Sequence, residues 1–167
     1  NPHHTVEEDY NWFPAVIFPA SQLNILPYTR LIKDLHGQSS TEFLSKLKDV
    51  VRVDDNGSPS PQAPGQASLY LDGRWYGITF HEDASAGPIE QLDVSRLQDK
   101  VLGPLLGIGD PRTDERIDFV GGIRGTGELE KRVNSGAWTC AFSLYPVTVD
   151  QLMAIADAGE IMPPKST

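Results

Sequence analysis

The dipeptide Asp72-Gly73 constrains the fold most, because it separates two apolar runs by the two residues of a tight β-hairpin. Residues 68–71 precede it and residues 74–80 follow it. A primed two-residue turn needs positive φ angles, which glycine adopts without strain. The sequence therefore predicts an antiparallel strand pair in the middle of the chain, and the fold must contain a sheet.

Two helices are predicted from their N-terminal capping signals. Ser39 with Glu42, and Thr148 with Gln151, have capping-box spacing, and apolar residues at helical intervals follow each pair. Gly159 is suited to the C-terminal cap of the second helix. These helices need a sheet on which to pack their apolar faces.

The other elements are predicted from apolar periodicity and from glycine or proline breaks. We expect strands at residues 10–18 and 24–32, which would pair, at 117–120 and at 138–145, and helices at 93–102, with Asp93 as N-cap, and at 128–134. The last strand is nearly all apolar, which favours a central position. Residues 54–66 contain few apolar side chains and are expected to form a mobile loop.

Together these elements predict one α+β domain over residues 1–167, with a mixed sheet and about four helices in two layers. The chain of 167 residues has the size of a single domain. It begins with Asn rather than Met and ends without a closing element. We therefore expect it to be a fragment of a longer protein.

The charge balance and the single cysteine limit the classes of function. With 14 basic and 23 acidic residues the net charge is -9, which argues against binding to nucleic acid or to an anionic membrane. There is no apolar run of the ~20 residues that a membrane helix needs. Cys140 has no second cysteine for a disulfide, and its position in an apolar strand makes it a poor nucleophile. A cytoplasmic protein is expected.

The segment Gly121-Gly122-Ile123-Arg124-Gly125 is one candidate ligand site. Backbone N–H groups before a helix, helped by Arg124, can bind a phosphate or carboxylate. The segment lacks the spacing of the known phosphate-binding loops, and a structural turn whose glycines adopt positive φ is the favoured interpretation.

Three other basic residues, Arg30, Arg112 and Lys165, are candidate anion contacts in this acidic chain. Arg112 lies in a run of alternating charges, which is more typical of a solvated, self-paired loop. His3 and His4, beside three carboxylates, are weak candidates for a metal site, and a solvated terminal segment is the favoured alternative. We therefore predict no metal.

Four stretches carry a resemblance to a known family: Asn1-Pro2-His3-His4, Tyr10-Asn11-Trp12-Phe13, residues 25–30 (Ile-Leu-Pro-Tyr-Thr-Arg) and residues 154–167. Together they resemble the second half of DUF1015, a bacterial and archaeal family of unknown function. Longer members carry an upstream Asp-Gly-His-His-Arg motif similar to that of ParB-like and sulfiredoxin-like folds. Some relatives of those folds bind or hydrolyse nucleotides, and some phosphorylate free serine.

That motif is absent from this chain, so the resemblance implies that the catalytic segment lies upstream and transfers no catalytic residue. The cofactor stays unknown, with a nucleotide as the candidate for the full-length protein, and the resemblance implies the upstream segment as a partner. Our leading hypothesis is a C-terminal part that binds a small anionic ligand, such as a nucleotide or phosphorylated metabolite. The alternative is a non-catalytic scaffolding or dimerisation domain, with Trp12, Phe13, Trp75 and Tyr76 at its interface.

Overall fold

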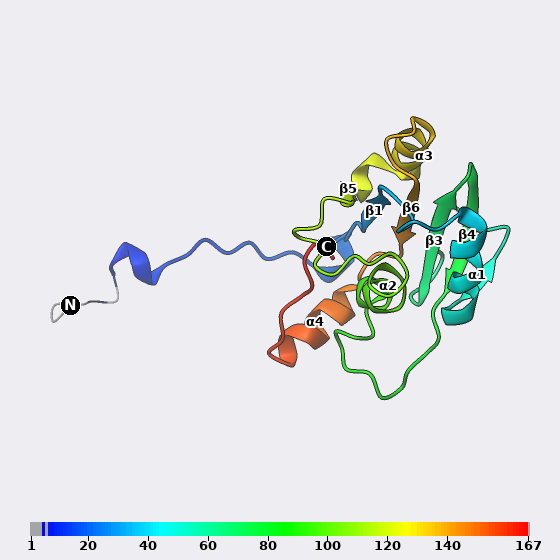
Figure 1. Cartoon of the computed structure of the whole chain (residues 1–167). Coiled ribbons are helices and arrows are strands. Elements are labelled where there is room, and N and C mark those ends of the chain that lie inside the picture. The colour runs from blue at the N-terminus through cyan, green and yellow to red at the C-terminus, as the bar shows by residue number, and fades with distance from the viewer. Residues whose placement is uncertain (1–4, 6, 167) are drawn as a thin grey trace.

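The computed structural model describes residues 5 and 7–166, and its centre is one six-stranded sheet (Figure 1). The strand order is β2-β4-β3-β6-β1-β5. The strands are β1 (Tyr28–Ile32), β2 (Arg52–Asp54), β3 (Gln66–Leu71), β4 (Arg74–Thr79), β5 (Ile117–Gly121) and β6 (Cys140–Leu144). The α-helices are α1 (Ser40–Val50), α2 (Asp93–Leu97), α3 (Thr126–Asn134) and α4 (Val149–Asp157). The predicted α+β class is confirmed.

The prediction of a mixed sheet is wrong, because every strand pair of the described sheet is antiparallel. A mixed sheet needs at least one parallel pair, and β5 and β6, which α3 connects, do not form one. These two strands do run in the same direction, since each is antiparallel to β1. They do not pair with each other because β1 lies between them.

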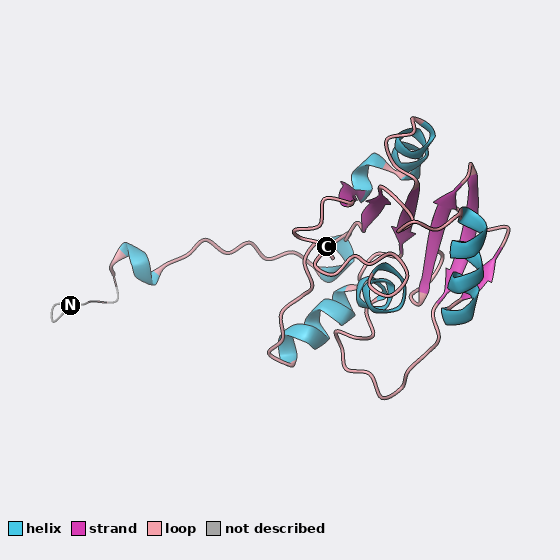
Figure 2. Cartoon of the chain, in the orientation of Figure 1, coloured by secondary structure: helices cyan, strands magenta, loops and turns pink. Residues whose placement is uncertain are grey.

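The prediction of two layers is also wrong, because helices cover both faces of the sheet (Figure 2). On one face, side chains of α1, α2 and α4 pack with the alternate residues Leu69 and Leu71 of β3. On the other face, α3 packs its Leu129 and Val133 near Tyr70. The five residues of β6 are all buried, as expected for a central strand covered on both sides.

The local predictions with the strongest signals are confirmed. Leu71 pairs with Arg74 across the hairpin, and Asp72 and Gly73 have φ angles of 50° and 78°. Ser39 forms its capping box with Glu42 at the start of α1. A second capping box begins α4 at Thr148.

The N-terminal strand prediction is wrong for the part of the chain that the structure describes. Residues 10–18 pair with no described strand, and only a short 3-10 helix, η1 (Asp9–Asn11), forms there. Of residues 24–32, only Tyr28–Ile32 forms a strand, and its neighbours are β5 and β6. Pro27, which lacks an N–H donor, precedes that strand. A second 3-10 helix, η2 (Ala20–Gln22), lies between the two segments.

The predicted helix at residues 93–102 exists, but its start and geometry differ from the prediction. Leu92 is the N-cap, and α2 continues as a π-helical segment, η3 (Gln98–Leu102). The buried Asp93 does not cap the helix; both of its carboxylate oxygens accept from the Gly65 backbone N–H, at 2.9 and 3.0 Å. Burial raises the pKa of Asp93 to about 6.

Residues 54–66 connect β2 to β3, and their mobility stays a prediction. Two contacts hold parts of this segment against the body. The Gly57 N–H donates to the Trp75 carbonyl at 3.1 Å, and Gly65 donates to Asp93. Within the described chain, no helix is long and apolar enough to cross a lipid bilayer.

Candidate functional site

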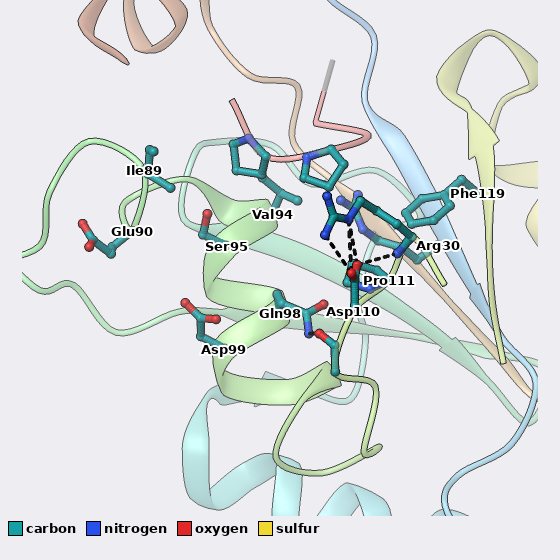
Figure 3. A pocket seen from close by; sticks show the side chains of 14 residues that line it. Arg30, Ile89, Glu90, Val94, Ser95, Gln98, Asp99, Asp110, Pro111 and Phe119 are labelled. Carbon is teal, nitrogen blue, oxygen red and sulfur yellow. Dashed lines mark hydrogen bonds and ion pairs between the residues drawn. The ribbon is translucent and has the colours of Figure 1, made fainter. Parts of the chain in front are cut away.

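A cleft of about 480 Å³ lies between the β1-β5 part of the sheet and the α2-η3 helix (Figure 3). Its walls come from segments that are far apart in the sequence. They are Arg30 on β1, Ile89, Glu90, Val94, Ser95, Gln98 and Asp99 on and before α2 and η3, residues 109–112, Phe119 on β5, and Pro163 and Pro164 near the C-terminus. Apolar side chains and prolines form much of the wall, and one buried cation lies among them.

Arg30 is that buried cation, with only 3% of its surface exposed. One terminal guanidinium nitrogen donates to the Tyr28 carbonyl, and the other donates to the Lys165 carbonyl at 3.2 Å. The guanidinium carbon lies 5.6 Å from the centre of the Phe119 ring, within the range of a cation–π contact. The side chain is therefore fixed by two carbonyls and an aromatic face.

No carboxylate of the described residues forms an ion pair with Arg30. Burial lowers the pKa of the Arg30 guanidinium to about 9, because the charged form loses its hydration. At neutral pH the side chain still carries its proton. The cleft thus contains a positive charge that no carboxylate of the described residues pairs with.

Arg112 lines the same cleft but already has a partner. Its side chain is exposed and makes a two-pronged contact with Asp110, with Nε–Oδ1 at 2.9 Å and Nη2–Oδ2 at 2.8 Å. The hydrogen bonds from Arg112 lower the pKa of Asp110 to about 2. This pair is close to neutral as a unit, so Arg30 is the stronger candidate for an anion contact.

The opposite wall is polar and partly acidic. Figure 3 shows Ser95, Gln98 and Asp99 on the helix, with Glu90 in the segment before it. Gln98 already donates its amide to the Ile108 carbonyl at 2.7 Å. Glu90 and Asp99 are exposed and would repel a ligand with excess negative charge.

The glycine turn does not line this cleft. It forms η4 (Gly122–Arg124) between β5 and α3, with Arg124 exposed. Structural needs account for two of its glycines. A Cβ atom on Gly122 would lie 2.7 Å from the Pro27 carbonyl oxygen, and Gly125 has a φ of 69° as the N-cap of α3. Gly121 pairs with Tyr28 in the sheet.

The remaining predicted site residues are divided between the cleft's edge and the undescribed part of the chain. Lys165 reaches Arg30 through its backbone carbonyl, while its ammonium group lies 5.5 Å from the Tyr28 ring centre. His3 and His4 lie outside the described residues. Among those that are described, no cluster of three His, Cys, Asp or Glu side chains could hold a metal ion.

A larger hollow of about 730 Å³ lies beside the loop that follows β4. Its lining includes His81, Glu82, Asp83 and Lys100, all of them exposed. None of these side chains is a buried charge that lacks an ion pair with a described residue, as Arg30 is. We therefore take the smaller cleft as the candidate site.

Sequence reasoning identified Arg30 and Arg112 but missed the rest of the cleft. Phe119 and Val94 look like ordinary core residues in the sequence, and Ser95 and Gln98 look like ordinary helix residues. Their shared feature is position around one cavity, which local patterns do not reveal.

Residues 1–95 match the model of a family described as "Protein of unknown function (DUF1015)". This chain belongs to the DUF1015 family. The matched region contains β1, which supplies Arg30, but it ends within α2 and does not reach β5 with Phe119. The family description assigns no activity to the DUF1015 chain.

Solved structures resemble the DUF1015 chain in fold. A free serine kinase in complex with AMP is 16% identical, with a TM-score of 0.51 over 85% of this chain and 52% of the other. A conserved hypothetical protein from Pyrococcus furiosus has the same identity and TM-score, over 85% and 54%. The chain thus spans about half the length of these structures. No curated protein matches it.

Proposed function

We propose that this chain binds a small anionic ligand, such as a nucleotide or a phosphorylated metabolite, in the cleft around Arg30. The observation that carries the proposal is the buried guanidinium with no carboxylate partner among the described residues. Buried charges in proteins are usually paired, because an isolated one loses its hydration without compensation. A bound anion would supply the missing partner.

The surroundings of Arg30 suit an anion attached to an apolar body. A guanidinium presents a planar fork of N–H donors that matches the two oxygens of a carboxylate or phosphate. The guanidinium carbon lies over the Phe119 ring, and Ile89, Val94 and Pro163 offer an apolar surface in the same cleft. Because Glu90 faces the same cleft, a singly charged anionic group fits better than a polyphosphate without a counter-cation.

The structural comparisons support the choice of probes. One structure of similar fold is a free serine kinase in complex with AMP. At 16% identity this similarity concerns the fold alone, and the ligand of that kinase is carried to this chain only as a proposal. AMP, ADP, ATP and phosphoserine are therefore the first ligands to test.

Isothermal titration calorimetry of the chain with these four ligands tests the proposal. We expect at least one to bind, and the Arg30→Gln variant to lose that binding. Arg124→Gln is the matched control, because it also removes one positive charge but lies at the exposed glycine turn. The cleft is refuted if a folded wild type binds none of the four at millimolar concentration. Loss of binding in Arg124→Gln alone would assign the site to the glycine turn instead.

The second candidate is a non-catalytic scaffolding or dimerisation domain. Trp12 and Phe13 favour it, because 71% and 85% of their surfaces are exposed. Tyr76 does not, since it is buried, and Trp75 packs on Tyr70 at a centroid distance of 5.0 Å. A dimer seen by light scattering that dissociates in Trp12→Ser would support this function; a monomer at all concentrations would exclude dimerisation through these rings.

A further inference from the structure

The N-terminal arm, which we define as residues 7–23, carries a dense group of exposed apolar side chains. Figure 1 shows it projecting away from the sheet. The exposed fractions are 71% for Trp12, 85% for Phe13, 74% for Val16, 93% for Ile17 and 58% for Phe18. Large apolar side chains that gather in one short segment usually mark a surface that becomes buried in a contact.

Residues 14–18 of the arm have the sequence of a strand that is buried on both faces. In an extended chain, Val16 and Phe18 point to one face, while Ala15 and Ile17 point to the other. Both faces are therefore apolar, a pattern typical of inner strands of a covered sheet. Pro14 and Pro19 bound the segment, and proline is accepted at the first position of a strand.

The structure gives this strand-like segment no sheet. Residues 13–18 form no ladder with any described strand, and all of them are exposed. Pairing with the arm of a second copy would satisfy one edge only. It would leave both apolar faces uncovered, and an isolated two-stranded ribbon is barely stable in water.

We propose that residues 14–18 are a strand of a second folded unit, supplied by the same polypeptide outside these 167 residues, in which both faces of its sheet are covered. The matched structures support this occupant, because the chain covers only 52–54% of their length. Within residues 7–29 there is no Lys or Arg, while Glu7, Glu8 and Asp9 begin the arm. The receiving edge should accordingly be neutral or basic.

The arm is joined directly to the candidate cleft. Residues 19–27 connect the strand-like segment, residues 14–18, to β1, whose third residue is Arg30. Nine residues span at most about 30 Å when fully extended. The second unit would therefore lie within that distance of the start of β1, beside the strand that carries the buried charge.

Hydrogen exchange distinguishes the two states of the arm. The 167-residue chain is compared with the longest natural polypeptide that contains it. We expect the amides of residues 15–18 to exchange freely in the short chain and about 100-fold or more slowly in the longer one. Equal, fast exchange in both would overturn the proposal.

A substitution gives an independent readout. Ile17→Asp should leave the melting temperature of the short chain unchanged, because the side chain is 93% exposed there, and should lower that of the longer polypeptide. Ile161→Asp is the matched control, with 87% exposure outside the arm, and should change neither. If the short chain instead forms a dimer that Ile17→Asp dissociates, the occupant is a second copy and the second unit is refuted.

Discussion

Replacing Arg30 with methionine should remove ligand binding while changing the stability of the ligand-free chain only slightly. Methionine keeps much of the side-chain volume and packs against Phe119, but it has no charge. An arginine that serves the fold through an ion pair would behave differently. Breaking a buried pair typically costs 3–5 kcal/mol, because the abandoned carboxylate stays buried.

Two opposing contributions set the expected magnitude. Because each pKa unit corresponds to about 1.4 kcal/mol, keeping this guanidinium charged in the interior costs on the order of 5 kcal/mol. Against this, the charge donates to the carbonyls of Tyr28 and Lys165, and each such bond contributes roughly 1.5–3 kcal/mol. The two contributions nearly offset each other, so Arg30→Met should change the free energy of unfolding by less than about 2 kcal/mol.

Urea unfolding at pH 7, with and without the ligand identified by calorimetry, measures both effects. A ligand at 100 times its Kd should stabilise the wild type by about 2.7 kcal/mol and leave Arg30→Met unchanged. The pH dependence gives a further check. Above about pH 9 the folded protein releases the Arg30 proton before the unfolded chain does, so the wild type should gain stability relative to the variant.

The reasoning would be refuted by a loss of 3–5 kcal/mol in ligand-free Arg30→Met. That result would mean that Arg30 holds the fold together and that its charge is not reserved for a ligand. A variant that still binds the ligand with unchanged affinity would refute the site.

Three further predictions concern other parts of the chain. Burial raises the pKa of Asp93 to about 6, so between pH 4 and 6 the folded state binds a proton that the unfolded state has released. The free energy of unfolding should therefore fall by up to about 3 kcal/mol as the pH rises from 4 to 6, and Asp93→Asn should flatten that dependence in urea titrations. Gly57→Ala should destabilise the folded chain by about 1–3 kcal/mol, because a Cβ atom would lie 2.1 Å from a backbone nitrogen of β4. The control Gly109→Ala, whose Cβ would have no atom within 4 Å, should not; equal melting temperatures for the two variants would instead favour a mobile loop. Burial raises the pKa of Cys140, so a thiol reagent such as DTNB should label it only after unfolding, and rapid labelling of the native chain would contradict that burial.

The sequence predicts the elements that depend on neighbouring residues. The Asp72-Gly73 turn and the capping boxes at Ser39 and Thr148 involve groups at most three residues apart, so their chemistry is visible locally. The strand directions were not predictable in this way. They depend on β1 lying between β5 and β6, and no local pattern specifies which strand occupies that place.

The candidate site was predictable only as isolated charges. Arg30 and Arg112 could be selected as basic residues in an acidic chain, but the sequence does not say which of them is buried. Composition treats the two as equivalent charges, but Arg112 forms an ion pair with Asp110, whereas the buried Arg30 has no ion pair with a described residue. The aromatic partner, Phe119, is 89 positions away and carries no local signal.

Because β1 lies between two strands that are synthesised much later, its half of the sheet can form only late during protein synthesis. Its partners β5 and β6 follow it by roughly 90 and 110 residues, which a ribosome needs roughly 5–20 s to add. The strands β2, β3 and β4 lie within residues 52–79 and can pair long before that. Until β6 emerges, Arg30 stays hydrated, so we expect nascent chains stalled before residue 117 to resist protease in the β2-β4-β3 half and to be cut readily at Arg30. The cleft would then be the last part of the molecule to form, and premature termination would yield a partly folded product without the candidate site.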